Sequence, residues 1–72
     1  MDRIYVDSSN IASIGYDEET DVLEIEFKSG SIYAYDDVPF YLYAQLMNAP
    51  SKGKFFNTNI KKQYYDKTRR IK

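Results

Sequence analysis

The 72-residue sequence contains neither cysteine nor histidine. Without cysteine the chain cannot form a disulfide, a thiolate zinc site or a cysteine nucleophile, and without histidine it lacks the commonest general base and metal ligand. No apolar run approaches the roughly 18 residues that cross a bilayer, and the first residues lack the apolar stretch of a signal peptide. We therefore expect a cytoplasmic protein with no cofactor, no metal and no membrane partner.

Glycine and proline are scarce as well, with three and two occurrences, so most of the chain can enter regular structure. Apolar residues make up 43% of the chain and aromatic residues 17%, which suits a packed globule rather than a disordered chain. A chain of this length has room for one domain only. We place that domain at residues 1–72, with its core at about 8–65 and a basic C-terminal tail at 66–72 that we expect to be frayed.

Alternation of apolar and polar residues predicts strands in the first half of the chain. Residues 22–27 place Leu23, Ile25 and Phe27 in alternation with Glu24 and Glu26, which is typical of a strand with one buried and one wet face. The runs before and after it, residues 11–16 and 31–35, are also β-prone and are joined to it by short polar turns. The three strands together predict an antiparallel meander.

A change of periodicity after residue 36 predicts two helices. Pro39 suits the first position of one helix, Pro50 ends it, and Ser51 is a good N-cap for the next. The apolar stripes at helical spacing are Val38, Leu42, Leu46 and Ala49, then Phe56, Ile60 and Tyr64. We predict an α+β fold of order β-β-β-α-α, in which two helices cover one face of a three-stranded antiparallel meander. The predicted core is Leu23, Ile25, Phe27, Leu42, Leu46, Phe56 and Ile60.

The direction of Tyr33 and Tyr35 depends on the length of the hairpin loop before them. A two-residue loop that ends at Gly30 would turn both side chains to the wet face, and a three-residue loop would turn them to the core, because a one-residue slip exchanges the faces. Glycine is the usual left-handed residue at the third loop position, which favours the core.

Charge is divided unevenly along the chain. Residues 1–50 carry two basic and ten acidic side chains (−8), and residues 51–72 carry eight basic and one acidic (+7), within a net charge of −1. This asymmetry predicts either a face that binds a polyanion or an attraction between the two ends of the chain inside the fold.

The second helix is the candidate phosphate-binding element. Its start should present free backbone N–H groups, which suit phosphate oxygens, and lysines follow on its outer face. Gly53 in its first turn allows either close packing or close approach of a phosphate. The candidate residues are Ser51, Lys52, Gly53, Lys54, Asn57, Lys61 and Lys62, with possible aromatic contacts from Tyr33, Tyr35 and Tyr65 and added charge from Arg69 and Arg70.

Two motifs have plain structural interpretations. Ser51 and Lys54 match the S-x-x-K signature of serine nucleophiles, but a chain of this size has no room for the scaffold and cleft that the signature needs. Asp17, Glu19 and Asp21 match the start of a calcium loop, whose required glycine and final glutamate are missing, so a solvated turn is expected. We predict no catalytic residues and no enzymatic activity.

The acidic residues offer an alternative binding surface on the sheet. Glu24 and Glu26 should point outward and join the acids of the preceding turn in one anionic patch. The turn residues of this patch are Asp17, Glu18, Glu19 and Asp21. Such a patch would dock a basic protein, as a small phage-type inhibitor or adaptor does.

The ordered motifs of the chain resemble the KTSC domain family, which occurs at the C-terminus of some lysyl-tRNA synthetases and as small stand-alone proteins of bacteria and phages. The resemblance covers about residues 8–65. It is carried by Gly15-Tyr16-Asp17, Leu23-x-Ile25-x-Phe27, Gly30, Tyr33-x-Tyr35, Val38-Pro39, Ser51-x-Gly53-x-x-Phe56-Asn57 and Ile60. The synthetase context implies RNA binding. We therefore expect a small non-catalytic module with weak, sequence-tolerant RNA or other nucleic-acid binding; a protein-interaction module and a small nucleotide-ligand binder are the alternatives.

Overall fold

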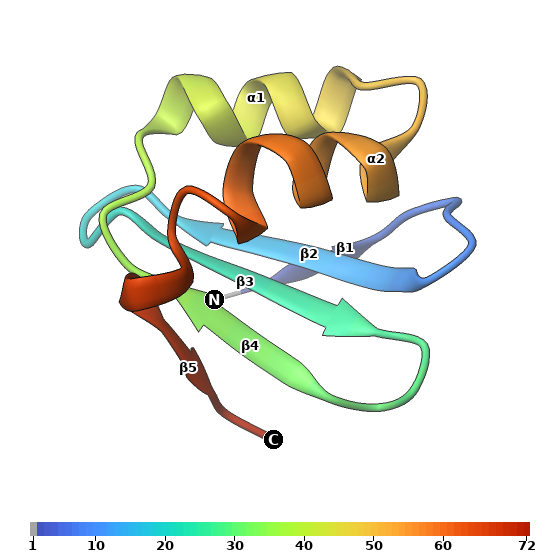
Figure 1. The fold of residues 1–72 in the computed structure, drawn as a ribbon, viewed down its shortest axis with the longest axis horizontal. Helices are drawn as coiled ribbons and strands as arrows, with labels where there is room; N and C mark the ends of the chain where they lie inside the picture. The colour runs from blue at the N-terminus through green and yellow to red at the C-terminus, as the bar shows by residue number, and fades with distance from the viewer. Residues whose placement is uncertain (1) are drawn as a thin grey trace.

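A single antiparallel sheet, covered on one face by helices, forms the framework of the protein (Figure 1). The computed structural model describes residues 2–72, and its strands follow the spatial order β1-β2-β3-β4-β5. In chain order the elements are β1 (Arg3–Tyr5), β2 (Ile11–Asp17), β3 (Val22–Phe27), β4 (Ile32–Tyr35), α1 (Phe40–Asn48), α2 (Lys52–Phe56), the π-helical turn η1 (Asn57–Lys61), the 3₁₀ turn η2 (Tyr65–Lys67) and β5 (Thr68–Arg70).

The predicted α+β class and the two helices on one sheet face are confirmed, but the number of strands predicted, three, is wrong. Two three-residue edge strands, β1 and β5, extend the meander to five strands, and β5 returns to the sheet after the helices. Segments this short contain too little alternation to be recognised from sequence. Their pairing partners, β2 and β4, determine their conformation instead.

The basic C-terminal segment is therefore not a frayed tail. Thr68 pairs with Tyr35 in the sheet, and two ion pairs bind the segment to the loop after β4: Lys67 Nζ to Asp37 Oδ2 at 2.9 Å and Arg69 Nη2 to Asp36 Oδ1 at 3.1 Å. These pairs join the basic end of the chain to its acidic half. The predicted attraction between the two halves is thus present for two of the basic side chains, Lys67 and Arg69.

The hairpin between β3 and β4 has the three-residue loop, and both tyrosines lie on the core side. The backbone N–H of Phe27 donates to the carbonyl of Ser31 at 2.9 Å, and Gly30 has a φ of +99°, which glycine adopts without strain. In this register Tyr35 is opposite Leu23 and Tyr33 is opposite Ile25. The predicted direction is confirmed.

The core fills the space between the helices and the sheet. Leu23, Ile25, Leu46, Phe56 and Ile60 are at most 1% exposed, as predicted. Leu42 is also buried, and Phe27 is partly buried against the same cluster. The apolar stripe of α1 begins at Val38, which is fully buried. Pro39 is the N-cap of α1 rather than its first helical residue.

Tyr16 joins β2 to the start of α1. Its ring stacks on Tyr43 with centroids 4.7 Å apart, and its hydroxyl donates to the carbonyl oxygen of Val38 at 2.6 Å. Burial, followed by the nearby charge of Asp21, raises the pKa of Tyr16 to about 12. The fold therefore favours the neutral phenol over the phenolate.

We expect Tyr16→Phe to destabilise the fold by about 1 kcal/mol at neutral pH, because the carbonyl of the buried Val38 loses its hydrogen-bond donor. A raised pKa means that the folded state keeps the phenol proton longer than the unfolded state does. The stabilisation is complete below the unfolded value near pH 10 and is lost as pH rises toward 12. Urea denaturation of both proteins from pH 8 to 12 should show the gap between them closing. A gap that stays constant would contradict the shifted titration.

Candidate nucleic-acid interface

The start of α2 makes several contacts within the chain. The Ser51 Oγ accepts a hydrogen bond from the backbone N–H of Lys54 at 3.4 Å, so Ser51 is the predicted N-cap. The Lys52 ammonium donates to the carbonyl of Ala49 at 3.3 Å. A Cβ at Gly53 would lie 2.9 Å from Oδ1 of Asn10 in the β1–β2 loop, so the glycine allows close packing on that loop.

A π-helical turn changes the course of this helix. Residues 57–61 (η1) continue α2 with a wider turn while Ile60 remains fully buried. Such turns are rare and occur frequently at functional sites. This one ends at Lys61 and is followed directly by Lys62, and both side chains are exposed. The wider turn determines where these two lysines lie. The periodicity of the sequence does not predict this turn.

A hollow of about 280 Å³ lies between the end of this helix and the sheet. Aromatic rings from β3, β4 and η2 form most of its wall, and Lys61 stands at its side. Its lining residues are Phe27, Tyr33, Tyr35, Lys61, Tyr65 and Thr68. Burial raises the pKa of the Tyr35 phenol, and a hydrogen bond with Thr68 offsets a part of that rise. The hollow is thus largely apolar, with few polar groups.

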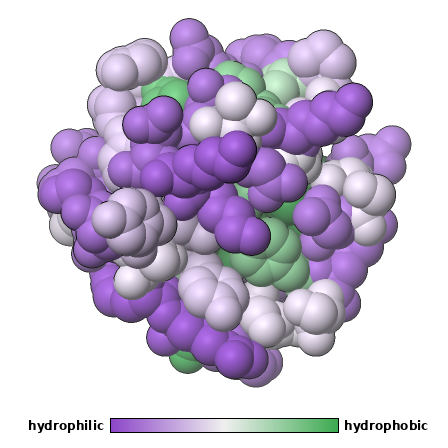
Figure 2. All heavy atoms as spheres, viewed as in Figure 1, coloured by the Kyte–Doolittle hydropathy of each residue, from purple (hydrophilic) through white to green (hydrophobic). Residues whose placement is uncertain are grey.

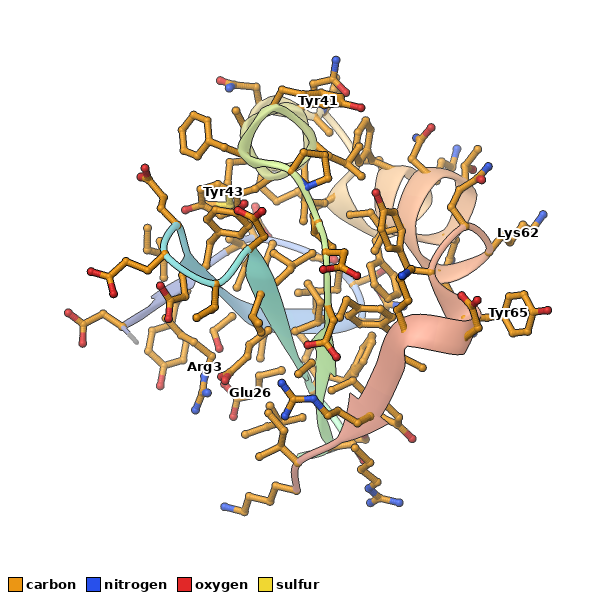
Figure 3. The ribbon with its side chains drawn as sticks, turned by 90° about the vertical axis from the view of Figure 1, so that its left-hand side faces the viewer. Arg3, Glu26, Tyr41, Tyr43, Lys62 and Tyr65 are labelled. Atoms are coloured by element: carbon orange, nitrogen blue, oxygen red, sulfur yellow. The ribbon has the colours of Figure 1, made fainter. Side chains whose placement is uncertain are left out.

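A second, shallower hollow of about 530 Å³ adjoins the first and shares Lys61 and Tyr65 with it. Its lining residues are Asn57, Lys61, Lys62 and Tyr65. We call the two hollows together the aromatic–lysine groove. Figure 2 shows apolar surface between hydrophilic side chains below α2, and Figure 3 shows Lys62 and Tyr65 projecting outward on the same side of the molecule.

The groove brings together six of the ten predicted site residues. These are Tyr33, Tyr35, Asn57, Lys61, Lys62 and Tyr65. Ser51, Lys52 and Gly53 lie at the helix start, outside the groove, and Lys54 is exposed on the first turn after them. Phe27 and Thr68 are lining residues that the sequence did not indicate: Phe27 carried only a core signal, and Thr68 belongs to a segment predicted to be frayed.

The lysines of the groove carry free positive charge. Three ion pairs occur among residues 2–72, and neither Lys61 nor Lys62 takes part in any of them. Both side chains are exposed, so they can meet a ligand without first breaking a contact within the chain. The groove therefore combines unpaired cationic groups with aromatic surface.

One of the two outward glutamates on the acidic side of the sheet has a cationic partner. Glu24 and Glu26 do point away from the helices, but the Arg3 guanidinium lies 2.6 Å from Glu24 and the Ser13 hydroxyl donates to Glu26 at 2.6 Å. Gly15 lies between Arg3 and Glu24 in the sheet and has no side chain to separate them. Figure 3 places Arg3 and Glu26 away from Lys62 and Tyr65. A strongly anionic docking patch is therefore weakened at its centre.

Asp17 of the acidic turn and Ser51 of the S-x-x-K motif both make hydrogen bonds to the backbone. The Asp17 carboxylate accepts the backbone N–H of Glu19 at 2.9 Å and shapes the β2–β3 turn. Ser51 caps α2, as described above. Within residues 2–72 no group of three potential metal-ligating side chains gathers. In the same described part of the chain, no helix has the length and apolar character needed to cross a membrane.

Comparison with known proteins identifies the family to which the chain belongs. The family model described as the KTSC domain matches residues 7–64. The chain belongs to the KTSC domain family. An uncharacterized protein of Stutzerimonas stutzeri is 43% identical over 65 residues, which cover 90% of this chain and 92% of that protein. A lysine–tRNA ligase of a Nostoc species is 45% identical over 58 residues, which cover 81% of this chain but only 10% of the ligase.

A solved structure resembles this KTSC domain over almost its whole length, including the C-terminal segment. The crystal structure of a KTSC domain protein from Yersinia pestis has a TM-score of 0.93 and 41% identity, and covers 99% of this chain and 97% of its own. The family match ends at residue 64, whereas Tyr65 and Thr68 lie beyond it. Coverage of 99% includes β5, so the strand that completes the groove belongs to a shared fold.

Proposed function

We propose that this KTSC domain is a non-catalytic module that binds single-stranded RNA weakly through the aromatic–lysine groove. The observation that carries the proposal is the juxtaposition of two unpaired lysines, Lys61 and Lys62, with the exposed ring of Tyr65. Cationic side chains along a groove and aromatic rings for stacking are the two recurrent components of single-strand binding sites. The name of the Nostoc relative, a lysine–tRNA ligase, supports an RNA context for the family.

The expected binding is weak and tolerant of sequence. Lysine is a point charge that contacts phosphate oxygens, and contacts to phosphates position a strand without reading its bases. The net charge of the chain is −1, so long-range attraction to a polyanion is small. Free charge near the groove comes from Lys61, Lys62 and, about two turns earlier on the helix, Lys54. We propose that the protein acts in the cytoplasm, where RNA is accessible.

Salt dependence tests this function. If about three phosphates are neutralised, the affinity for a mixed-sequence single-stranded RNA should fall with a log–log slope near −2. The measurement is fluorescence anisotropy of a labelled oligonucleotide over a range of salt concentrations. An analogue with the same bases and an uncharged backbone is the control, and it should bind poorly with no salt dependence. Affinity that is indifferent to salt would refute phosphate binding by the lysines.

A further inference from the structure

We propose that the smaller hollow of the groove holds one unpaired nucleobase, so that the protein selects strands with bases free to leave the stack. This inference rests on the proposed RNA binding and adds the chemical group that enters the hollow. It concerns Phe27, Tyr33, Tyr65 and the neighbouring Lys61.

The size of the hollow fits one planar ring system. Its volume of about 280 Å³ is just below the range of roughly 300 to 1,000 Å³ that is usual for small-molecule sites. The hollow therefore has room for a single flat group. The adjoining shallow hollow leaves space for the strand to continue past Lys61 and Lys62.

The inner wall of the hollow packs against the core. Phe27 and Tyr33 meet edge to face with centroids 6.0 Å apart. Behind them Phe56, which is 1% exposed, packs edge to face against Phe27 at 5.7 Å and Tyr35 at 5.5 Å. A preformed aromatic wall avoids the cost of ordering side chains when a base enters.

Tyr65 forms the solvent-facing side of the site, because the residue is 76% exposed beside both hollows. It lies on η2, between the helix and β5, and its ring takes part in none of the ring–ring contacts found among residues 2–72. A ring with a free face next to an apolar hollow is suited to stacking on a base. Tyr65 therefore supplies a platform that the fold itself does not use.

Lys61 links the base to the backbone of the strand. It lines both hollows, so its ammonium can reach a phosphate next to a base that occupies the smaller one. The polar groups of the hollow are few, which favours recognition of any flat ring over hydrogen-bonded reading of one base. A base within a duplex is stacked and paired, and must first be unstacked to enter, at an energetic cost.

Three RNAs with the same number of phosphates test the inference: a single strand, the same strand made fully abasic, and a duplex with as many phosphates in total. We expect the single strand to bind about tenfold or more tightly than either of the others. Tyr65→Ala should remove most of this preference, and Tyr65→Phe should keep it because the ring remains. Tyr5→Ala, which removes another highly exposed tyrosine away from the groove, is the matched control and should leave binding unchanged.

The outcomes separate this inference from the proposed function. Equal binding of the intact and the abasic strand, with a salt slope preserved, would overturn the base-holding hollow and leave phosphate binding intact. Loss of preference in Tyr5→Ala as much as in Tyr65→Ala would also overturn it. If none of the three RNAs binds, both the inference and the proposed RNA binding fail.

Discussion

Replacement of Phe56 by alanine is expected to destabilise this KTSC domain by about 3 to 5 kcal/mol, the usual cost of removing a buried phenylalanine ring. The side chain is 1% exposed and joins α2 to the sheet through Phe27 and Tyr35. A 72-residue domain has a free energy of unfolding of roughly 4 to 11 kcal/mol. The substitution should therefore remove a large part of the stability and lower the melting temperature by more than about 10 °C.

Urea denaturation followed by circular dichroism measures this loss, and Tyr41→Ala serves as the matched control. Tyr41 is also aromatic and helical, but it is 65% exposed, so its truncation should change the free energy of unfolding by less than about 1 kcal/mol. Equal midpoints for the two variants would show that Phe56 does not hold the helix on the sheet.

Reversal of the groove charge is expected to have the largest effect on binding. Lys61→Glu with Lys62→Glu removes two phosphate contacts and adds two repulsive ones. Hydrogen bonds to charged groups contribute about 1.5 to 3 kcal/mol each, so the affinity for single-stranded RNA should fall more than about 100-fold. Both side chains are exposed and outside the ion pairs of the described residues, so the melting temperature should stay within a few degrees of the wild type.

A second double variant controls for the change in net charge. Lys28→Glu with Lys72→Glu alters two exposed lysines that line neither hollow, and it takes the net charge from −1 to −5, as the groove variant does. We expect this control to weaken binding by less than about tenfold, through general repulsion only. If both variants lose affinity equally in anisotropy titrations, the lysines of the groove have no special role.

The central strands and helices were predictable because each contains a repeated physical signal. Alternation of Leu23, Ile25 and Phe27 with glutamates indicated β3, and Gly30 fixed the hairpin register that turns Tyr35 into the core. The edge strands were not predictable. Arg3–Tyr5 and Thr68–Arg70 are only three residues long and held by their neighbours, so their own sequence does not identify them.

The candidate groove was predictable in its residue types but not in its location. Lysines on the second helix and tyrosines from β4 were candidates from sequence. The candidates at the helix start lie outside the groove, next to the Ser51 cap and Asn10, and stay a prediction. The groove depends on the π-helical turn before Lys62 and on the return of the chain as β5. Both features arise from tertiary packing, which no local pattern encodes.

The one-sided attachment of the C-terminal segment divides the protein into parts of unequal stability. β5 pairs with β4 alone, and the ion pairs of Lys67 with Asp37 and of Arg69 with Asp36 are exposed and contribute little. Local opening of residues 65–70 therefore costs less free energy than global unfolding. Because Tyr65 and Thr68 detach with it, such opening dismantles the groove while the core around Phe56 stays folded. The groove thus has its own local equilibrium, and the proposed ligand, by bridging Tyr65 and the helix, would shift that equilibrium toward the closed sheet.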